Sequence, residues 1–481
     1  MRALAIDVGT TSIRTAIVDT DGNVTHARRR RLSLTTPNPG EVELDGVEIA
    51  RLALELATST LNEAGGADVV GITNQRATTI VFDPVTGVPV GPALGWQDLR
   101  TVMDCLVLQG EGLRLAPNQS ATKARWLVQQ SGRDSSELRF ATIETWLAWN
   151  LSGGTLHVTD RSNAGVNGLV ALGIEEWDQH ALSVLGLDAS MMPSIVDTMG
   201  SIGHATSLPG APLITALVGD QPASLFGQSC VTRGAKITFG TGAMLDMVRG
   251  SKGPDRMTRF ASGCFPVVLR SVDHELIWGI EGIVLSAGAC IEWFRDLGLI
   301  TNADETESLA ESVSSTEGVT FVPALSGLGT PQWDFGARGG FFGITRGSTR
   351  AHMVRAMLEG IAQRGADLVD AAHEETGQTL EEIRVDGGMS DNRFLVQCLA
   401  DFTGLRVAVS PERDATTRGA GLMALVGRDA LAIDDVEGLW SPSVVLTPSI
   451  DEDVRRRRRD EWAVLVTRVE KMIPELSSVE F

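Results

Sequence analysis

The beginning of the chain alternates between apolar runs and short polar turns. An apolar segment at 3–8 leads into a Gly-Thr-Thr turn, and a second apolar segment follows at 13–18. An Asp-Thr-Asp-Gly-Asn sequence at 19–23 separates the second segment from a third run that ends near residue 32. Turn sequences between strand-like runs are typical of antiparallel hairpins. The pattern predicts a three-stranded antiparallel meander.

A strand, a Gly-Thr-Gly turn and a return strand occur again in the middle of the chain, at 236–239, 240–242 and 244–248. This second hairpin resembles the first in shape more than in letters. In both, backbone N–H groups and threonine hydroxyls converge on one tight bend, an arrangement that can hold phosphate groups. Two such hairpins, one in each half, predict a duplicated architecture whose halves face one nucleotide across a cleft.

Helical and strand-like patterns alternate through the rest of the chain, which predicts layered α/β domains. We expect helices at 47–64, 121–130, 143–151 and 350–370, another helix from about 391, and strands at 69–73 and 213–218. The strand at 213–218 delivers Asp220 near its carboxyl end. We place the change of domain near 224–234 and expect two domains, 1–228 and 229–481.

Composition and charge narrow the class of protein. The chain has 481 residues, of which 43% are hydrophobic and 21% charged, as in ordinary globular proteins. Its net charge of -20 argues against a nucleic-acid partner, because such binding depends on neutralising phosphates with Lys and Arg. Two basic runs, 28–31 and 455–459, adjoin acidic or strand-like sequence, and we interpret both as solvated faces.

The cysteines and the amino terminus add further expectations. The five cysteines are scattered and form no C-x-x-C pair, which predicts reduced, buried thiols instead of a disulfide framework or a zinc site. An acidic residue, Asp7, comes too early for a signal peptide, and no apolar run approaches the length of a membrane span. We therefore expect a cytoplasmic protein with no membrane partner.

Several polar residues fall where phosphoryl transfer would need them. That reaction requires phosphate contacts, an anchor for a metal ion and a base near the acceptor hydroxyl. Asp7 ends the first strand and is placed to hold Mg2+ through water, Arg14 follows on the return strand, and Asp220 is the candidate base. Each residue alone has a plainer interpretation as a turn or a helix cap. Only the combination of these residues indicates phosphoryl transfer.

Motifs across nearly the whole chain carry a resemblance to a known family. They are Asp7-Val-Gly-Thr-Thr-Ser-Ile-Arg14, Ile72-Thr-Asn-Gln-Arg76, Trp96-Gln-Asp98, Thr122-Lys123, Gly219-Asp-Gln221, Phe239-Gly-Thr-Gly242, Gly327-Leu-Gly329 and Val385-Asp-Gly-Gly388. The chain resembles the FGGY carbohydrate kinases of the actin, Hsp70 and hexokinase superfamily, most of all the glycerol kinases. The resemblance implies two ribonuclease H-like, actin-like ATPase domains around a nucleotide-binding cleft.

The resemblance also implies roles for individual residues. Residues 1–228 would carry the first phosphate hairpin and the acceptor pocket, and 229–481 the second hairpin and the adenine site. Asp220 would take the proton from the acceptor hydroxyl. The nucleotide contacts, with ATP and Mg2+ as cofactors, would come from Thr10, Thr11, Ser12, Arg14, Gly240, Thr241, Gly288, Gly388 and Asn392. Glu292 stands where the family has a glutamine. Family members are often homodimers or homotetramers, which we expect here.

The acceptor pocket departs from the pattern of glycerol kinases. Arg76, Trp96 and the Asp220-Gln221 pair match, but the resemblance places Ala77 at a glutamate position, Asn118 at a tyrosine position and Met244 at an aromatic position. Losing a hydrogen bond to a charged group typically costs roughly 1.5–3 kcal/mol, so glycerol recognition is weakened.

Three functions stay open at this point. The first is ATP-dependent phosphorylation of glycerol to glycerol 3-phosphate. The second is the same reaction on a longer polyol or ketose, such as a tetritol or pentulose. Arg14, where pentulose kinases more often carry lysine, argues against a pentulose. The third is an actin-like or Hsp70-like ATPase that hydrolyses ATP without an acceptor. The sequence shows nothing that resembles a polymerisation insert or a peptide-binding domain, which argues against this function.

Overall fold

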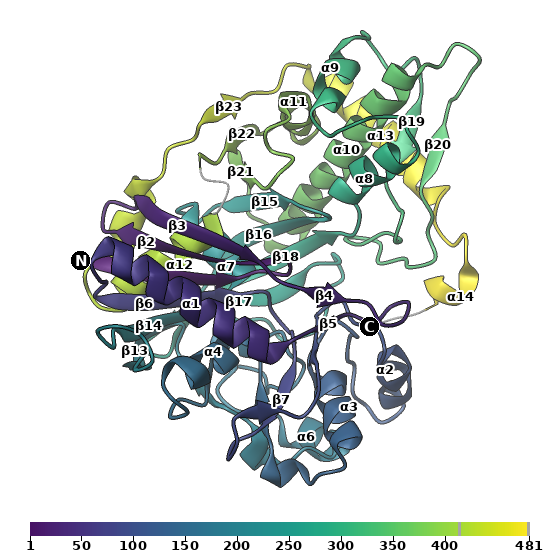
Figure 1. Cartoon of the computed structure of the whole chain (residues 1–481). Helices are drawn as coiled ribbons and strands as arrows, with labels where there is room; N and C mark the ends of the chain where they lie inside the picture. Colours follow the sequence, from purple (N-terminus) through teal and green to yellow (C-terminus); the bar gives the residue numbers. More distant parts are fainter. Residues whose placement is uncertain (412–414, 479–481) are drawn as a thin grey trace.

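The computed structural model describes residues 1–411 and 415–478 and consists of two lobes, each built on a mixed sheet (Figure 1). The first lobe contains the amino terminus and the second contains most of the chain after residue 235. Two short helices, α7 (Asp220–Gly227) and α12 (Ala415–Val426), lie between the two sheets. The expected α/β fold with two domains is confirmed.

The sheet of the first lobe has six strands and contains the predicted meander. In spatial order they are β13 (Met199–His204), β14 (Leu213–Gly219), β6 (Val69–Asn74), β1 (Arg2–Val8), β2 (Ser12–Asp19) and β3 (Val24–Arg31). β1 and β3 both pair antiparallel with β2, whereas β6 runs parallel to β1. The central strands β6 and β14 are almost fully buried, as expected for strands covered on both faces.

Helices cover both faces of this sheet. α1 (Gly46–Ala64) packs on β2 and β3, and α12 packs on the opposite face against β1 and β6. The predicted helix begins where the Asp45 carboxylate accepts hydrogen bonds from the N–H groups of Val47 and Glu48, and it ends at Gly65, whose φ is 73°. α7 lies very close to α12, because a Cβ on Gly419 would be 1.8 Å from the carbonyl oxygen of Ala223.

The sheet of the second lobe repeats the arrangement of the first. Its seven strands are, in spatial order, β17 (Phe265–Val272), β18 (Glu275–Val284), β16 (Ala243–Gly250), β15 (Ala235–Phe239), β21 (Glu382–Asp386), β22 (Arg406–Val409) and β23 (Val444–Leu446). The hairpin β15–β16 is antiparallel and β21 runs parallel to β15, just as β6 runs parallel to β1. The two hairpins that the sequence predicts therefore occupy corresponding places in two similar sheets.

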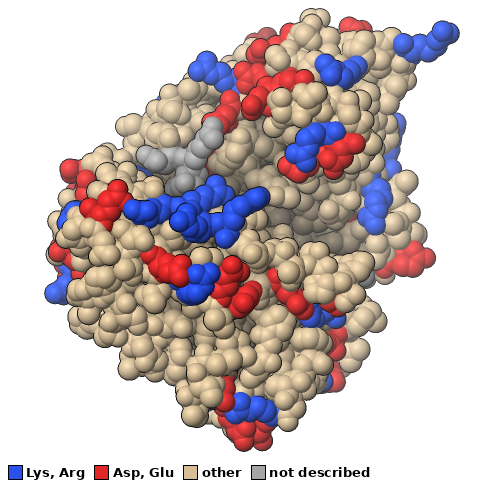
Figure 2. Space-filling view, in the orientation of Figure 1, with Lys and Arg blue, Asp and Glu red and all other residues tan. Residues whose placement is uncertain are grey.

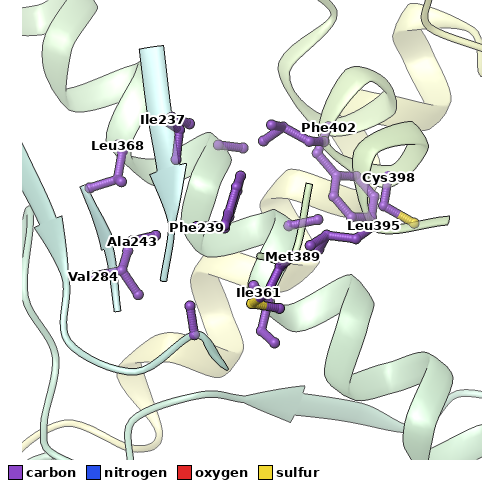
Figure 3. Close-up of a cluster of buried hydrophobic side chains, with 14 of the residues drawn as sticks. Ile237, Phe239, Ala243, Val284, Ile361, Leu368, Met389, Leu395, Cys398 and Phe402 are labelled. Carbon is purple, nitrogen blue, oxygen red and sulfur yellow. The ribbon is translucent and has the colours of Figure 1, made fainter. Parts of the chain in front are cut away.

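A large apolar core lies between this second sheet and its helices. Figure 3 shows Phe239 and Ile237 of β15 among side chains from α10 (Arg350–Thr376) and α11 (Arg393–Thr403). The helix predicted at 350–370 continues to Thr376 and ends at Gly377, whose φ is 65°. The other helices of this lobe are α8 (Gly288–Asp296), α9 (Glu305–Glu311), α13 (Glu452–Thr467) and α14 (Pro474–Ser477).

Shorter elements complete the fold. In the first lobe the helices are α2 (Val102–Gln109), α3 (Ala121–Ser131), α4 (Ile143–Leu151), α5 (Arg161–Ala164) and α6 (Gln179–Leu185). Small sheets are formed by β4 (Leu34–Thr35), β5 (Glu43–Leu44) and β9 (Ala93–Leu94), by β7 (Ile80–Asp83), β8 (Val88–Pro89) and β10 (Arg139–Ala141), by β11 (Val158–Asp160) and β12 (Ser194–Val196), and by β19 (Thr320–Val322) and β20 (Gly340–Phe342).

The prediction that the basic run at 455–459 is a solvated face is wrong in part. Arg458 and Arg459 of α13 point at α10, where Arg458 pairs with Glu359 at 2.5 Å and Arg459 pairs with Asp367 and Asp370 at 2.6 Å. The run at 455–459 is thus not simply a solvated face, because two of its members dock one helix on another.

Two other expectations concern cysteines and membranes. All five cysteines are buried and free, as predicted. Within residues 1–411 and 415–478, no helix is both long and apolar enough to cross a bilayer.

Candidate active site

Asp220 lies at the junction of β14 and α7, between the two lobes. Ser162 holds the junction by accepting a hydrogen bond from Gly219 N at 2.9 Å. The Asp220 carboxylate accepts hydrogen bonds from Gln221 N at 2.8 Å and from Arg76 Nε at 3.2 Å. Burial raises the pKa of Asp220 above its ordinary value, although the charge of Arg76 opposes the shift. Because its side chain is still 29% exposed, Asp220 combines basicity with access to a bound molecule.

Arg76 follows β6 and connects the two lobes. Its guanidinium pairs with Asp220 and, through Nη2, with Glu281 of β18 at 2.5 Å. Burial alone would lower the pKa of Arg76, but the charges of Glu281 and Asp220 raise it instead. The arginine is therefore held as a cation beside the candidate base, with only 11% of its side chain exposed.

Behind these residues a polar network crosses from the second sheet to α7. Lys236 Nζ donates to Gln221 Oε1 at 2.5 Å and to Thr238 Oγ1 at 2.7 Å. Thr238 donates to Asp386 at 2.5 Å, and Ser224 of α7 donates to the same carboxylate at 2.9 Å. The network fixes the first turns of the helix that begins with Asp220.

The strand register explains why charged groups gather here. Lys236, Asp246 and Glu281 are direct neighbours across β15, β16 and β18, so their side chains project from one face of the sheet. Together with Asp220, the carboxylates of Asp246 and Glu281 outnumber the cations of Arg76 and Lys236. Burial, together with the nearby Asp246, raises the pKa of Glu281 to about 7.

Asp7 forms a second acidic position at the end of β1. Only 2% of its side chain is exposed, and its Oδ2 accepts hydrogen bonds from Arg14 at 3.2 Å and from Thr417 of α12 at 3.1 Å. Burial raises the pKa of Asp7 to about 6, and the negative charge of Asp220 adds to the shift. The pKa of Asp7 is raised although Arg14 lies beside it, so a further cation or its water ligands would stabilise the carboxylate.

No described group of three or more His, Cys, Asp or Glu side chains could enclose a metal ion. An ion at Asp7 would thus depend on water and on the ligand's own oxygen atoms, as Mg2+ with nucleotide phosphates commonly does.

The first phosphate turn presents one threonine to solvent and uses another internally. Gly9 N donates to Ser12 O at 3.0 Å, which closes the turn. Thr11 is exposed, whereas Thr10 Oγ1 accepts a hydrogen bond from Trp96 Nε1 at 3.3 Å. Ser12 is buried, and its hydroxyl accepts from Arg29 Nε at 3.0 Å. Trp96 thereby joins the predicted acceptor pocket to the turn.

The second phosphate turn is packed against the start of α8. Gly240 N donates to Gly242 O at 2.9 Å, and the carbonyl of Thr241 accepts from the N–H groups of Ala287 and Ala289. A Cβ on Gly288 would lie 2.6 Å from Gly240 O, so only glycine permits this close approach. The side chain of Thr241 stays exposed at the tip.

The residues predicted to border adenine differ in how accessible they are to a ligand. The space around Gly388 is open, because a Cβ there would meet no atom within 4 Å. Asn392 caps α11 through Leu395 N and also donates to Thr306. Glu292 is 65% exposed and pairs with Arg295 at 3.0 Å, so it is not drawn into the charged cluster.

The three altered pocket residues also have distinct environments. Ala77 is buried with a φ of 60°, and its carbonyl accepts from Ser120 Oγ at 3.1 Å. Asn118 is exposed on a loop, where its carbonyl accepts from Lys123 Nζ at 3.4 Å. Met244 is half-buried on β16. A cavity of about 350 Å³ is lined by Gln119, Met257 and Phe265 among others, and neither Ala77, Asn118 nor Met244 is part of its lining.

Sequence reasoning did not single out Lys236, Asp246, Glu281 or Thr417 as site residues. For two of them a signal was present, because Asp246 and Glu281 are acids in the middle of mostly apolar strand sequence. An acid in such a strand needs a buried cation or proton, and it therefore suggests a site. Thr417 carries no comparable signal.

Comparisons with known proteins agree with this geometry. The N-terminal domain model of the FGGY family of carbohydrate kinases matches residues 2–227, and its C-terminal domain model matches 235–428. The chain is 36% identical to a glycerol kinase of Rhodopirellula baltica, covering 99% of this chain and 92% of that protein. It is 37% identical to a glycerol kinase of Deinococcus radiodurans, covering 97% of each.

A solved structure is similar over the whole length. The glycerol kinase of Plasmodium falciparum with ADP is 27% identical, covers 100% of this chain and 99% of its own, and superposes with a TM-score of 0.90.

Proposed function

Because this chain belongs to the FGGY family of carbohydrate kinases and so phosphorylates a carbohydrate-type acceptor with ATP, we propose that its acceptor is glycerol and its product glycerol 3-phosphate. The observation that carries the proposal is the position of Asp220, half-buried between the lobes, ion-paired with Arg76 and close enough to Asp7 for their charges to interact. Similarity to glycerol kinases over nearly the full length supports the choice of acceptor.

In the proposed reaction Asp220 accepts the proton of the attacking hydroxyl as that oxygen bonds to the γ-phosphorus. Arg76 and Gln221 hold the other hydroxyls, and Trp96 lies against the carbon chain. The hydroxyls and N–H groups of the two turns, at Thr10, Thr11, Gly240 and Thr241, contact the phosphates. Arg14 balances charge on the transferring group.

The metal and the nucleotide base have proposed positions as well. Asp7 fits Mg2+ through water, since burial raises the pKa of its carboxyl in spite of the nearby Arg14, and a further cation would stabilise the anion. When bound, the ion would neutralise charge on the β- and γ-phosphate oxygens. Adenine would lie against the open backbone at Gly388, where no side chain obstructs a flat ring. Closure of the lobes would exclude water, which is a competing acceptor.

A second candidate acceptor, a longer polyol or a ketose, has specific support. Ala77, Asn118 and Met244 are smaller or less polar than the residues expected of a glycerol pocket. A four- or five-carbon chain would occupy the room that these smaller side chains leave.

An acceptor scan tests both candidates. ADP release would be measured with ATP and Mg2+ for glycerol, erythritol, threitol, ribulose, xylulose, ribitol and xylitol, and kcat/KM compared. We expect glycerol to lead, and Asn118→Tyr, with Asn118→Ala as control, to increase that preference. A leading five-carbon acceptor would replace glycerol, and ATP turnover that needs no acceptor would contradict kinase activity on a small molecule.

A further inference from the structure

Four consecutive arginines, Arg28–Arg31, form the last half of the edge strand β3. In Figure 2 their blue side chains gather over β3 and reach the hollow between the two lobes. Four adjacent positive charges are unusual on a chain with a net charge of -20, and the groups that each guanidinium contacts indicate what the arginines can bind.

The strand register divides these arginines between two faces. Arg28 is opposite Thr15 and pairs with Glu63 of α1 at 2.5 Å, so it belongs to the α1 face. Arg29 is opposite Arg14, and Arg31 is opposite Ser12. Both therefore project on the other face, with the phosphate turn and Asp7. Arg30 alternates back to the α1 face.

The two arginines on the turn side are tied to the turn yet keep most of their donors. Arg29 Nε donates to Ser12 Oγ at 3.0 Å, which leaves its two terminal nitrogens available. The end of β3 is fixed to the turn, because Leu32 N donates to Thr11 O at 2.9 Å. Among the described residues, no carboxylate lies within 4.0 Å of the guanidinium nitrogens of Arg29 or Arg31.

The cross-strand pairing adds a second observation that points to an anion. Arg14 and Arg29 are direct neighbours on adjacent strands, and like charges directly opposite each other repel. Asp7 pairs with Arg14, whereas no carboxylate of the described residues pairs with Arg29. A bound anion between the arginines would relieve the repulsion. Phosphate oxygens match the planar fork of a guanidinium.

We propose that Arg29 and Arg31 form an outer anion site, continuous with the turn at 9–12, which binds the polyphosphate chain of the nucleotide. The inference rests on the proposed function, because it takes the nucleotide phosphates to lie at that turn. Residues two apart on a strand are about 6.8 Å apart along it, so two long side chains on one face can converge on one phosphate chain. Arg14, on the same face, extends the site inwards.

The test is the affinity of the full-length protein for sodium tripolyphosphate and for a non-hydrolysable ATP analogue, measured by titration calorimetry at low and moderate salt. Arg29→Ala and Arg31→Ala should each raise Kd about threefold to tenfold, the double variant more, and the loss should shrink as salt rises. Arg30→Ala is the matched control: it removes the same charge from the same strand but from the α1 face, and Kd should change less than twofold.

Each outcome decides the matter. Unchanged Kd for the double variant, with wild-type protein that binds the analogue and phosphorylates its acceptor, would overturn this inference alone. Failure of the wild-type protein to bind either probe would overturn the proposed function as well. A saturating ATP analogue should abolish tripolyphosphate binding, and retained binding would show a separate anion site and contradict continuity with the turn. If Arg30→Ala and Arg31→Ala raised Kd equally, the binding would reflect general charge attraction instead of a defined site, which would contradict the proposal.

Discussion

Lys236 and Asp246 face each other across neighbouring strands, with Nζ and Oδ2 2.9 Å apart and neither side chain exposed. Neither carboxylate oxygen of Asp246 has a hydrogen bond of good geometry among the described residues, so the attraction is mainly between charges. The ammonium group also donates to Gln221 and Thr238. One buried cation thus stabilises an acid in the second lobe and orients the residue next to Asp220.

Removing one partner of this pair should be costly. Asp246→Leu or Lys236→Met removes the direct partner of a buried charge, and each should lower the free energy of unfolding by about 3–5 kcal/mol. The double variant should recover more than half of that loss, because two apolar side chains replace the pair. Urea denaturation of all four proteins measures the coupling. Additive losses in the double variant would contradict it.

The same variants separate stability from catalysis. Because Lys236 holds Gln221, we expect the double variant to fold yet to show a raised acceptor KM with little change in ATP KM. Equal changes in both constants would argue against a positioning role.

Asp220→Asn should abolish the base but keep the shape of the site. We expect kcat to fall by about 10²–10⁴-fold, the usual contribution of general base catalysis, while the Kd of ATP changes less than threefold. Rapid-quench assays and calorimetry measure the two quantities. A kcat within tenfold of wild type would rule Asp220 out as the base.

The pH profile should reflect two raised carboxyl pKa values. Burial raises the pKa of Asp220, and it raises that of Asp7 to about 6. Both groups act as anions in the proposed reaction, so protonation on the acid side removes activity at a higher pH than for ordinary carboxyls. We expect kcat/KM to fall as pH drops from 7 to 5, with a midpoint near 6. Circular dichroism over the same range checks that the fold persists, and a flat profile would contradict the assignment.

The contact between α13 and α10 can be tested without touching the site. Arg459→Ala removes ion pairs to Asp367 and Asp370 and a hydrogen bond to Gln363 Oε1 at 2.6 Å. We expect the free energy of unfolding to fall by about 1–3 kcal/mol. Arg457→Ala, at an exposed position on the same helix, should change it by less than about 0.5 kcal/mol. Equal losses in a thermal melt would restore the interpretation of a solvated face.

Local patterns predicted most of the elements around the site. The two hairpins, α1 and the strand β14 all follow from apolar periodicity and from turn or cap residues close in sequence. The helix predicted at 350–370 begins at Arg350 as expected but continues to Thr376, where Gly377 caps it. Docking of Arg459 was missed because its partners lie on a helix distant in sequence.

The sequence by itself determined the kinds of chemistry available: two Gly-Thr turns, an acid at the carboxyl end of each of two strands, and an arginine on a return strand. Those features are local, since neighbouring residues decide a turn or a strand end. Only the tertiary structure decided that Arg76 bridges Asp220 and Glu281, and that Lys236 and Asp246 neutralise each other beneath Gln221. The physical reason is that register and lobe packing bring distant charges into a low-dielectric interior, where each must find a partner.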